Sequence, residues 1–286
     1  MFHFGLTRSL NIPKISFLCH HTGHSINTGR KMHRSLNSLP DSWKELLDSC
    51  LDDANYALCY LDGCARVVPK AEHIFRAFQM VEPQNVKVII VGQDPYPNSE
   101  HATGLAFGVN RGIDCPRTLT NILNEVEACL NEPEWDMVAK KQIPKDTIML
   151  NRSDVTLEGW AKQGVLLLNS VLTTEDRRIG AHTNIGWEAF TDNVLYSIRQ
   201  LHTIGPFRPI VFMLWGQLAQ AKYAQIAPRG ALPNWLKVLK STHPGPLSHN
   251  RGDLLMRFQG CRHFNAANTF LKRHGAEEID WSKTGA

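Results

Sequence analysis

Four short apolar runs constrain the fold of this chain more than any other feature of its sequence. They are Lys87–Val91, Val165–Leu168, Ile210–Leu214 and Leu236–Leu239. Short apolar runs bounded by turn-forming residues are typical of strands buried in a sheet. Long segments separate them, and in one of these, Trp187–Leu201, apolar residues recur at helical spacing. Strands joined by helical crossovers predict a single α/β domain, with a central four-stranded parallel sheet flanked by helices on both faces.

Each of the four runs ends in a cluster of polar and turn-forming residues. The clusters span residues 92–97, 169–170, 215–217 and 241–248. In an open parallel sheet, ligands bind outside the carboxyl ends of the strands. We therefore expect one crevice that collects Asp94, Asn169, His243 and two aromatic side chains. The polar segment Asn131–Leu157 has no clear period and is predicted to be a surface loop or insertion.

The charge of the chain is concentrated at its beginning. Residues 1–40 contain five basic and no acidic residues, although the whole chain carries 31 Lys and Arg against 27 Asp and Glu. The remainder is close to neutral, so any grip on nucleic acid must come from a local cleft and backbone amides. We predict an extension over residues 1–40 and a catalytic domain over residues 41–286. The extension is either disordered or a mitochondrial transit peptide, and Met32 is a possible alternative start.

The cysteines and histidines indicate neither disulfides nor a metal site. Seven cysteines are scattered without a CxxC pair, and the Cys59 to Cys64 spacing fits neither a zinc knuckle nor a redox motif. His182, His243 and His263 lack the spacing of metal ligands, so we expect no metal and no cofactor. No run of eighteen apolar residues exists, which excludes a membrane span. We expect a soluble intracellular protein, placed in the nucleus or mitochondrion of a eukaryote, or otherwise in a host nucleus or the cytoplasm.

Taken singly, the residues of the four clusters are commonplace. An Asp in a Gly-Gln-Asp-Pro turn usually caps that turn, and a Phe in Gly-Leu-Ala-Phe-Gly-Val usually belongs to the core. Their combination, in this order along the chain, is unusual. The segment Lys87–Tyr96 (KVIIVGQDPY) resembles the signature of the uracil-DNA glycosylases. The resemblance covers roughly residues 42–281 and continues through GLAFGV, GWAKQGVLLLNSVLT, GWEAFT, LWGQLAQ, HPGPLSHNRG, GCRHF and IDW.

This resemblance implies an enzyme that flips uracil out of DNA and hydrolyses its N-glycosidic bond, initiating base excision repair. Asp94 would stabilise the cationic sugar and orient or deprotonate the attacking water. A neutral His243 would donate a hydrogen bond to the uracil 2-carbonyl and stabilise the departing base. The clusters contain no lysine that could act as a Schiff-base nucleophile, so the glycosylase is expected to be monofunctional.

The same resemblance assigns four residues to the base. The Asn169 amide would pair with uracil N3–H and O4, which cytosine would mismatch. Phe107 would stack on the base, and Tyr96 would lie against C5 and exclude the methyl group of thymine. The backbone of Gln93 would line the pocket near the uracil carbonyls.

The residues expected to contact DNA lie in the loops around this pocket. Leu247 resembles the apolar wedge that fills the gap left by the flipped base, and Ser248 and Arg251 would contact the backbone. The other expected DNA contacts are Pro116, Arg117, Thr118, Gly216 and Gln217. We expect a monomer whose partner is single- or double-stranded DNA containing uracil, with a proteinaceous inhibitor and replication proteins as further candidates.

Several positions depart from the family pattern, and most of them lie in these loops. Pro97 replaces the histidine that usually follows the Pro-Tyr pair, and it cannot donate a hydrogen bond. Thr118, Gln217 and Gly245 stand where the family offers serines, and Pro116 stands alone in place of a run of prolines. Arg117 adds a charge that could contact a phosphate.

Two other functions remain open on the sequence alone. One is a non-enzymatic DNA-binding or replication accessory protein that retains the fold. The other is a glycosylase that acts mainly on thymine or other damaged bases. Release of free uracil from an oligonucleotide separates the first from a uracil glycosylase, and a panel of mismatched substrates separates the second.

The altered loops generate a prediction about DNA affinity. Because the base pocket is intact while the loops have changed at Pro97, Arg117, Gln217 and Gly245, uracil selectivity should be retained. Affinity for duplex DNA and its salt dependence should differ from those of relatives with serine loops. A titration of binding against salt concentration measures both. An affinity and slope equal to those of the relatives would contradict this prediction.

Overall fold

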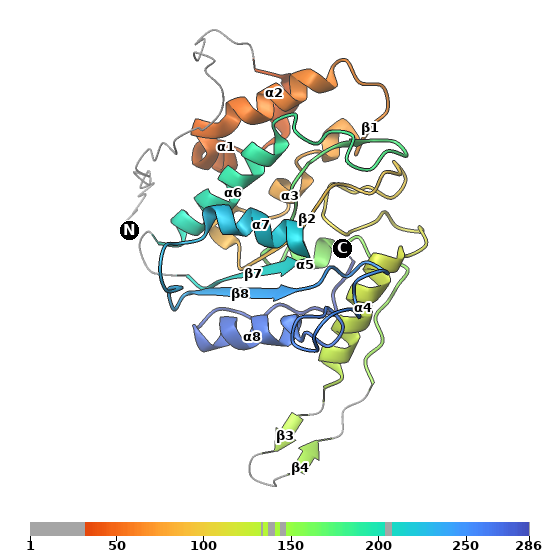
Figure 1. Cartoon of the computed structure of the whole chain (residues 1–286), viewed down its shortest axis with the longest axis vertical. Coiled ribbons are helices and arrows are strands. Elements are labelled where there is room, and N and C mark those ends of the chain that lie inside the picture. The colour runs from red at the N-terminus through yellow and green to blue at the C-terminus, as the bar shows by residue number, and fades with distance from the viewer. Residues whose placement is uncertain (1–31, 133, 137–140, 144–146, 204–207, 286) are drawn as a thin grey trace, which may run out of the picture.

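A parallel sheet of four strands forms the centre of the molecule (Figure 1). The computed structural model describes residues 32–132, 134–136, 141–143, 147–203 and 208–285. The strands are β2 (Val88–Gly92), β5 (Val165–Asn169), β7 (Ile210–Trp215) and β8 (Leu236–Ser241). They run in the order β5-β2-β7-β8, and all neighbours are parallel. Each of the four predicted runs forms one of these strands, so the predicted sheet is confirmed.

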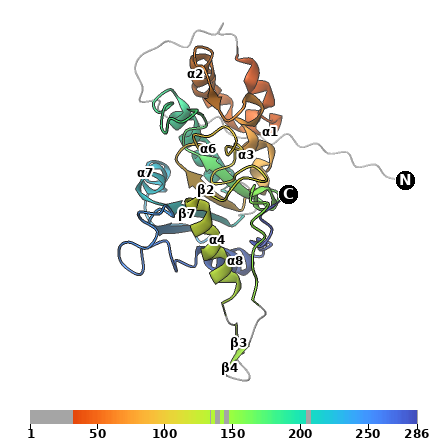
Figure 2. The same ribbon diagram turned by 90° about the vertical axis from the view of Figure 1, so that its right-hand side faces the viewer.

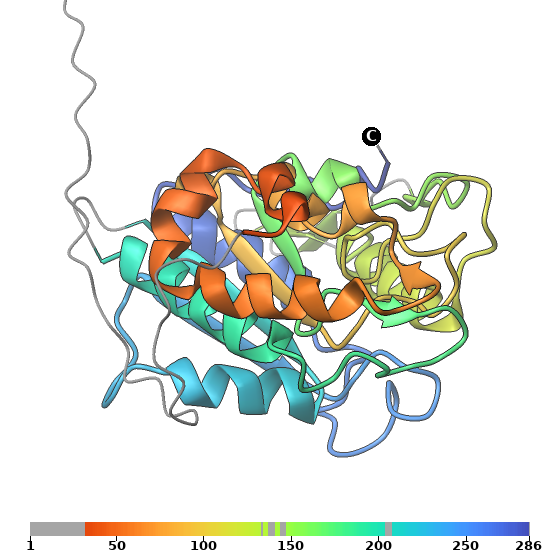
Figure 3. The ribbon, with the colours of Figure 1, turned by 90° about the horizontal axis from the view of Figure 1, so that it is seen from above.

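Helices cover both faces of the sheet, as predicted (Figure 1, Figure 3). On one face lie α6 (Trp187–Leu201) and α7 (Gln217–Ile226), with α1 (Asp41–Leu47) and α2 (Leu51–Leu61) packed outside α6. On the other face lie α4 (Arg117–Leu130) and α8 (His263–Arg273). The bounds of α6 are those predicted from the apolar spacing. None of the helices in the described ranges is long and apolar enough to cross a membrane.

Short elements connect these layers. They are the α-helical turns α3 (Arg76–Gln79) and α5 (Glu158–Ala161), the paired strands β1 (Val67–Val68) and β6 (Thr174–Glu175), and the 3-10 helices η1 (Arg34–Ser38), η2 (Asp48–Cys50), η3 (Ala71–His73) and η4 (Pro83–Asn85).

The two edge strands of the sheet differ in burial. Every residue of β2, β5 and β7 is buried, which explains their continuous apolar runs. In β8, at the edge, Lys237 and Lys240 are exposed while Leu236 and Ser241 are buried. Charged side chains on an edge strand discourage pairing with another chain. The weaker apolar run of β8 therefore reflects the exposure of its side chains, whereas β5, at the other edge of the sheet, is buried throughout.

The strand order places a binding crevice beside β2. From β2 the chain crosses to β5 on one side of it and then returns to β7 on the other side. Loops that leave β2 and β7 therefore diverge at the carboxyl edge of the sheet. Such a switch point is where open α/β sheets bind their ligands.

The segment predicted as a surface loop or insertion contains a hairpin, but its end is not at the surface, since Leu150, Val155 and Leu157 belong to the core. Strands β3 (Glu134–Asp136) and β4 (Lys141–Ile143) pair in antiparallel fashion and project from the end of α4 (Figure 1, Figure 2). At the base of the insertion, the Asn131 side chain accepts from the Ile148 N–H at 2.6 Å and donates to the Ile148 carbonyl at 2.8 Å. This two-way contact closes the insertion where it leaves the body of the protein.

The folded part begins earlier than the predicted boundary at residue 41. Leu36 and Leu39 are 4% and 1% exposed and belong to the hydrophobic core, and the His33 N–H donates to Asn55 Oδ1 at 2.6 Å. The boundary was misplaced because the composition of residues 33–40 resembles that of the preceding segment, whereas two leucines decide their packing. Residues 1–31, where the targeting prediction falls, lie outside the described residues.

This packing predicts a stability effect outside the expected domain. Leu39→Ala should lower the free energy of unfolding by about 2–4 kcal/mol, because it leaves a cavity in the core. Urea denaturation measures the change. Asn37→Ala is the matched control in the 3-10 helix that ends just before Leu39, since Asn37 is exposed, and it should change stability by no more than about 0.5 kcal/mol. Equal stabilities for the two variants would show that residues 33–40 do not belong to the core.

Candidate active site

The carboxyl ends of β2 and β5 are locked together at Gly92 and Asn169. These two residues are partners in the parallel register, and the Ser170 N–H donates to the Gly92 carbonyl at 2.9 Å. Asn169 is only 5% exposed, and a Cβ on Gly92 would lie 2.2 Å from its Oδ1. A side chain at position 92 would therefore displace the amide. Because Gly92 has no side chain, buried space remains for the Asn169 amide, which can both donate and accept hydrogen bonds.

Asp94 lies two residues beyond the end of β2 and is half-buried. The Gly180 N–H, from the loop after β6, donates to Asp94 Oδ2 at 2.7 Å. Burial raises the pKa of the Asp94 carboxyl, and the hydrogen bond from Gly180 works against this rise. The site thus holds a partly desolvated carboxylate in a fixed orientation.

His243 follows β8 and has a defined tautomer. The Gly245 N–H donates to His243 Nδ1 at 2.9 Å, so Nδ1 must carry the lone pair and Nε2 the proton. Burial lowers the pKa of His243, which favours the neutral ring. Gly216, which follows β7, packs closely against His243, because a Cβ on this glycine would lie 3.0 Å from His243 Cβ. The ring is therefore a neutral donor through Nε2.

Two aromatic residues adjoin these groups. Phe107 adopts a positive φ of 67°, and its ring centroid lies 5.5 Å from that of Trp215 and 6.2 Å from that of His243. A left-handed backbone at a bulky residue costs energy and is often found at functional sites. Tyr96 has a buried hydroxyl without a hydrogen-bond partner among the described residues, and burial raises its pKa. Both rings are held in place by packing.

A cavity of about 520 Å³ opens at this edge of the sheet, between the ends of β2 and β7. Of the predicted site residues, it is lined by Gln93, Gly216, Gln217, His243 and Ser248. Asp94, Tyr96, Phe107 and Asn169 do not line it. Phe107 packs on Trp215 and Asn169 stands against Gly92, and both of these partners do line the cavity. The structure thus brings the predicted pocket residues to one end of the sheet.

The predicted DNA-contact loops surround the same edge. The Asn121 amide, in the second turn of α4, donates to the Pro244 carbonyl at 2.8 Å, which ties the start of that helix to the His243 loop. Pro116 immediately precedes α4, Arg117 is exposed and Thr118 is half-buried. Leu247 is 76% exposed. Gln217 and Arg251 are also exposed, whereas Gly245 is buried and the Pro97 carbonyl accepts the Arg177 N–H.

Lys222 borders the site from outside the four clusters, in which the sequence has no lysine. It lines the 520 Å³ cavity from α7 and is 6% exposed. Its Nζ lies 2.6 Å from Asp192 Oδ1 and donates to the Glu188 carbonyl at 3.0 Å. Burial lowers the pKa of Lys222, and the Asp192 carboxylate opposes this shift. The sequence did not indicate this lysine, because it lies within α7 and only the fold brings its side chain to the cavity beneath the loops.

Two further features were not anticipated from the sequence. The Gly180 amide carries no side-chain signal, so no motif could have linked it to Asp94. Leu254 and Leu255 are 68% and 86% exposed, and the neighbouring Met256 carbonyl accepts the Thr242 N–H at 2.7 Å. A pair of exposed leucines in a loop is a signal that the sequence does carry. They stand on the same side of the fold as His243.

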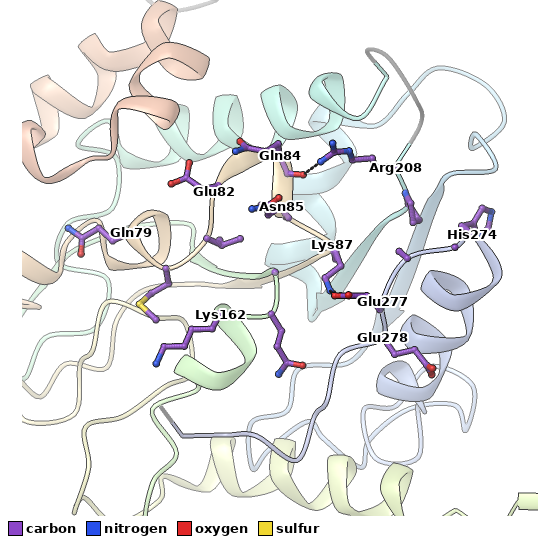
Figure 4. A pocket seen from close by; sticks show the side chains of 18 residues that line it. Gln79, Glu82, Gln84, Asn85, Lys87, Lys162, Arg208, His274, Glu277 and Glu278 are labelled. Atoms are coloured by element: carbon purple, nitrogen blue, oxygen red, sulfur yellow. Dashed lines mark hydrogen bonds and ion pairs between the residues drawn. The ribbon is translucent and has the colours of Figure 1, made fainter. Parts of the chain in front are cut away.

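A second cavity, of about 770 Å³, lies at the opposite, amino end of the strands (Figure 4). Lys87 and Glu277 point toward each other across it, with Lys87 Nζ 3.9 Å from Glu277 Oε2. Arg208 donates to the Gln84 carbonyl at its rim. It contains none of the predicted site residues, and this end of a parallel sheet is not where its ligands bind.

The fold and the site together define an open α/β protein that binds its ligand at the carboxyl edge of the sheet. The profile of the uracil DNA glycosylase superfamily matches residues 78–272. The uracil-DNA glycosylase of Xylella fastidiosa strain M23 is 38% identical over 266 residues, which is 91% of each chain. That of Francisella tularensis subsp. novicida is 40% identical over 216 residues, covering 76% of this chain and 84% of the relative. This chain belongs to the uracil-DNA glycosylase superfamily.

Solved structures agree with the fold. Mimivirus uracil-DNA glycosylase superposes with a TM-score of 0.62 at 23% identity, covering 89% of this chain and 95% of that one. A variant of the mimivirus protein in complex with UGI gives a TM-score of 0.69 at 24% identity, covering 87% and 91% of the two chains. The shared α/β architecture is thus independent of close sequence similarity.

The tautomer of His243 generates a prediction that needs no substrate. Nitrogen-15 NMR of the imidazole should show an unprotonated Nδ1 and a protonated Nε2 at neutral pH. On titration, its pKa should lie below the ordinary value of 6.5, because burial disfavours the charged ring. A ring protonated at Nδ1, or a pKa at or above 6.5, would contradict this account of the site.

Proposed function

We propose that this chain excises uracil from DNA by hydrolysing the N-glycosidic bond, leaving an abasic site as the first step of base excision repair. The chain is a DNA glycosylase of the uracil-DNA glycosylase superfamily. One observation carries the specific proposal for the site. A buried amide, Asn169, stands opposite a glycine that makes room for it, at the same edge as a neutral histidine with a free Nε2–H.

These two groups match the hydrogen-bonding edge of uracil. The Asn169 amide accepts from N3–H and donates to O4, and His243 Nε2–H donates to O2. Cytosine presents the opposite pattern at positions 3 and 4, which would leave buried polar groups unpaired. Phe107 stacks on the base, the backbone of Gln93 lines the pocket, and Tyr96 occupies the space that the thymine methyl would need.

The charges of the site fit the bond that is broken. Departure of the base develops positive charge on the sugar and negative charge on uracil. The Asp94 carboxylate, oriented by the Gly180 N–H, stabilises the sugar cation and aligns the attacking water. His243 stabilises the uracil anion as a hydrogen-bond donor, without transferring a proton. Lys222 is held by Asp192 and Glu188, which supports a hydrolytic, monofunctional reaction.

DNA binds across the loops at this edge. Leu247 enters the space left by the flipped nucleotide, and the exposed Leu254 and Leu255 extend this apolar surface. The backbone contacts come from Pro116, Arg117, Thr118, Gly216, Gln217, Ser248 and Arg251. The mimivirus protein in complex with UGI supports a proteinaceous inhibitor as a second partner. The proposed setting is intracellular, where DNA is the substrate.

Release of free uracil from an oligonucleotide tests the proposal. The protein should release uracil, and Asp94→Asn should lower the rate by roughly 10²–10⁴-fold, because the carboxylate is lost while the side-chain shape is kept. As a separate variant, Tyr96→Ala should release thymine as well as uracil, because the side chain that excludes the thymine methyl group is lost. Absence of release at any salt concentration would favour a DNA-binding accessory protein. Preferential release of thymine by the unaltered protein would favour a glycosylase for other bases.

Gly92→Ala tests the role of the glycine opposite Asn169. The added methyl group should displace the amide and lower kcat/KM for uracil release by roughly a hundredfold, since hydrogen bonds to a buried base contribute about 1–3 kcal/mol each. Gly63→Ala is the matched control, because its Cβ would lie 3.7 Å from the nearest atom, the Tyr60 carbonyl oxygen. Equal rates for the two variants would separate Asn169 from base recognition.

A further inference from the structure

Three side chains with metal-binding atoms meet away from the active site. Cys64 follows α2, Glu175 ends β6, and His182 lies in the segment that leads to α6. One sulfur, one carboxylate oxygen and one ring nitrogen of these residues all lie within 4.8 Å of one another. The pairing of β1 with β6, in which Val67 opposes Glu175, brings these distant parts of the chain together.

His182 is buried with a nitrogen that no described residue satisfies. The residue is 1% exposed, and its Nδ1 lies 3.0 Å from Thr173 Oγ1, which also accepts the Trp187 Nε1–H at 2.8 Å. Its Nε2 is buried without a hydrogen-bond partner among the described residues. An unpaired buried nitrogen of this kind is costly, and a bound water or ion is the usual explanation for such a group.

The orientation of the His182 ring fits a metal ligand. Histidines that bind a metal through one nitrogen usually donate from the other to a nearby oxygen, which fixes the ring. Here Thr173 Oγ1 stands at Nδ1, so Nε2 is the nitrogen left to bind. Burial lowers the pKa of His182, and a neutral ring is the form that metals require.

The other two groups also favour a cation between them. Burial raises the pKa of the Cys64 thiol, and the Glu175 carboxylate adds to the rise, so the thiolate is favoured only when a cation lies between the two groups. Glu175 Oε2 is engaged by Arg178 NH1 at 2.6 Å, which leaves Oε1 for a further contact. Arg178 opposes a metal by its charge, but it holds the carboxylate in place.

We propose that Cys64, Glu175 and His182 bind one divalent metal ion of the zinc class, with water as the fourth ligand. A thiolate, an imidazole and a carboxylate are together the donors that zinc prefers. Zinc bond lengths place tetrahedral ligand atoms about 3.5 Å apart, so side-chain rotations close the cluster around the ion. On binding, the Cys64 thiol loses its proton to solvent and its sulfur bonds to the metal.

The metal would tie together the loop that holds the catalytic carboxylate. Glu175 and His182 flank Gly180, whose N–H donates to Asp94 Oδ2. The Asp176 N–H donates to the Arg66 carbonyl, so the same loop already contacts the turn that contains Cys64. The ion therefore has a structural role in this loop. The sequence did not indicate this metal site, because its three ligands come from separate segments and show no local ligand spacing.

Metal binding by the full-length protein tests this inference directly. The protein is stripped with a chelator and titrated with Zn²⁺ against a chromophoric chelator, and separately with Co²⁺ in the presence of a thiol-free reductant. We expect a site in which Cys64→Ala weakens Zn²⁺ binding at least tenfold and removes the sulfur-to-cobalt charge-transfer absorption. Glu175→Gln should weaken binding while the absorption is retained. Cys59→Ser, on the exposed side of α2, is the matched control and should bind like the unaltered protein.

Two results would overturn the inference. One is no Zn²⁺ bound by the folded, unaltered protein at concentrations that saturate the chelator. The other is binding that is equal in Cys64→Ala and in the unaltered protein, which would assign the ion to other cysteines and histidines of the chain. Circular dichroism of each variant establishes that it is folded, and uracil release is not used as a readout.

Discussion

The parallel pairing of β2 with β5 is the contact on which the rest of the site depends. It sets Gly92 opposite Asn169, and the hydrogen bonds beyond the strand ends hold the two loops in the same register. A shift of one residue would turn the amide away from this edge, because side chains alternate between the faces of a sheet. The proposed base recognition therefore rests on backbone hydrogen bonds within the sheet, which make the amide rigid before any ligand arrives.

Burial acts in opposite ways on the two groups proposed for the chemistry. It raises the pKa of Asp94, which disfavours the carboxylate, and it lowers the pKa of His243, which favours the neutral ring. The Gly180 and Gly245 N–H groups each donate a hydrogen bond to one of these two side chains. One donates to the carboxylate and offsets part of its desolvation, and the other donates to Nδ1 and selects the tautomer. Two backbone N–H groups from loops thus set the charge and the direction of both side chains.

The sequence predicted the sheet more completely than the site. The four strands and α6 were recovered because continuous apolar runs and helical spacing report burial directly. The convergence of Asp94, Asn169 and His243 followed from the rule that parallel strands end at one edge. The start of the folded part was misplaced, since the burial of Leu36 and Leu39 depends on packing against helices distant in the sequence.

Other features depend on contacts that no local pattern records. The Gly180 amide, the Lys222–Asp192 ion pair and the Cys64, Glu175 and His182 cluster each join segments far apart in the chain. Their geometry arises from tertiary packing, so composition and spacing could not indicate them. The convergence of the predicted residues on one edge of the sheet was accessible from the sequence, whereas the groups that orient them were not.

A crystal structure of the Asp94→Asn variant bound to DNA containing uracil tests the central claim most directly. The account predicts a uracil rotated out of the helix, with N3–H and O4 paired to the Asn169 amide and O2 within hydrogen-bond distance of His243 Nε2. A uracil that remains stacked in the DNA, or one that is flipped but paired to other residues, would contradict it.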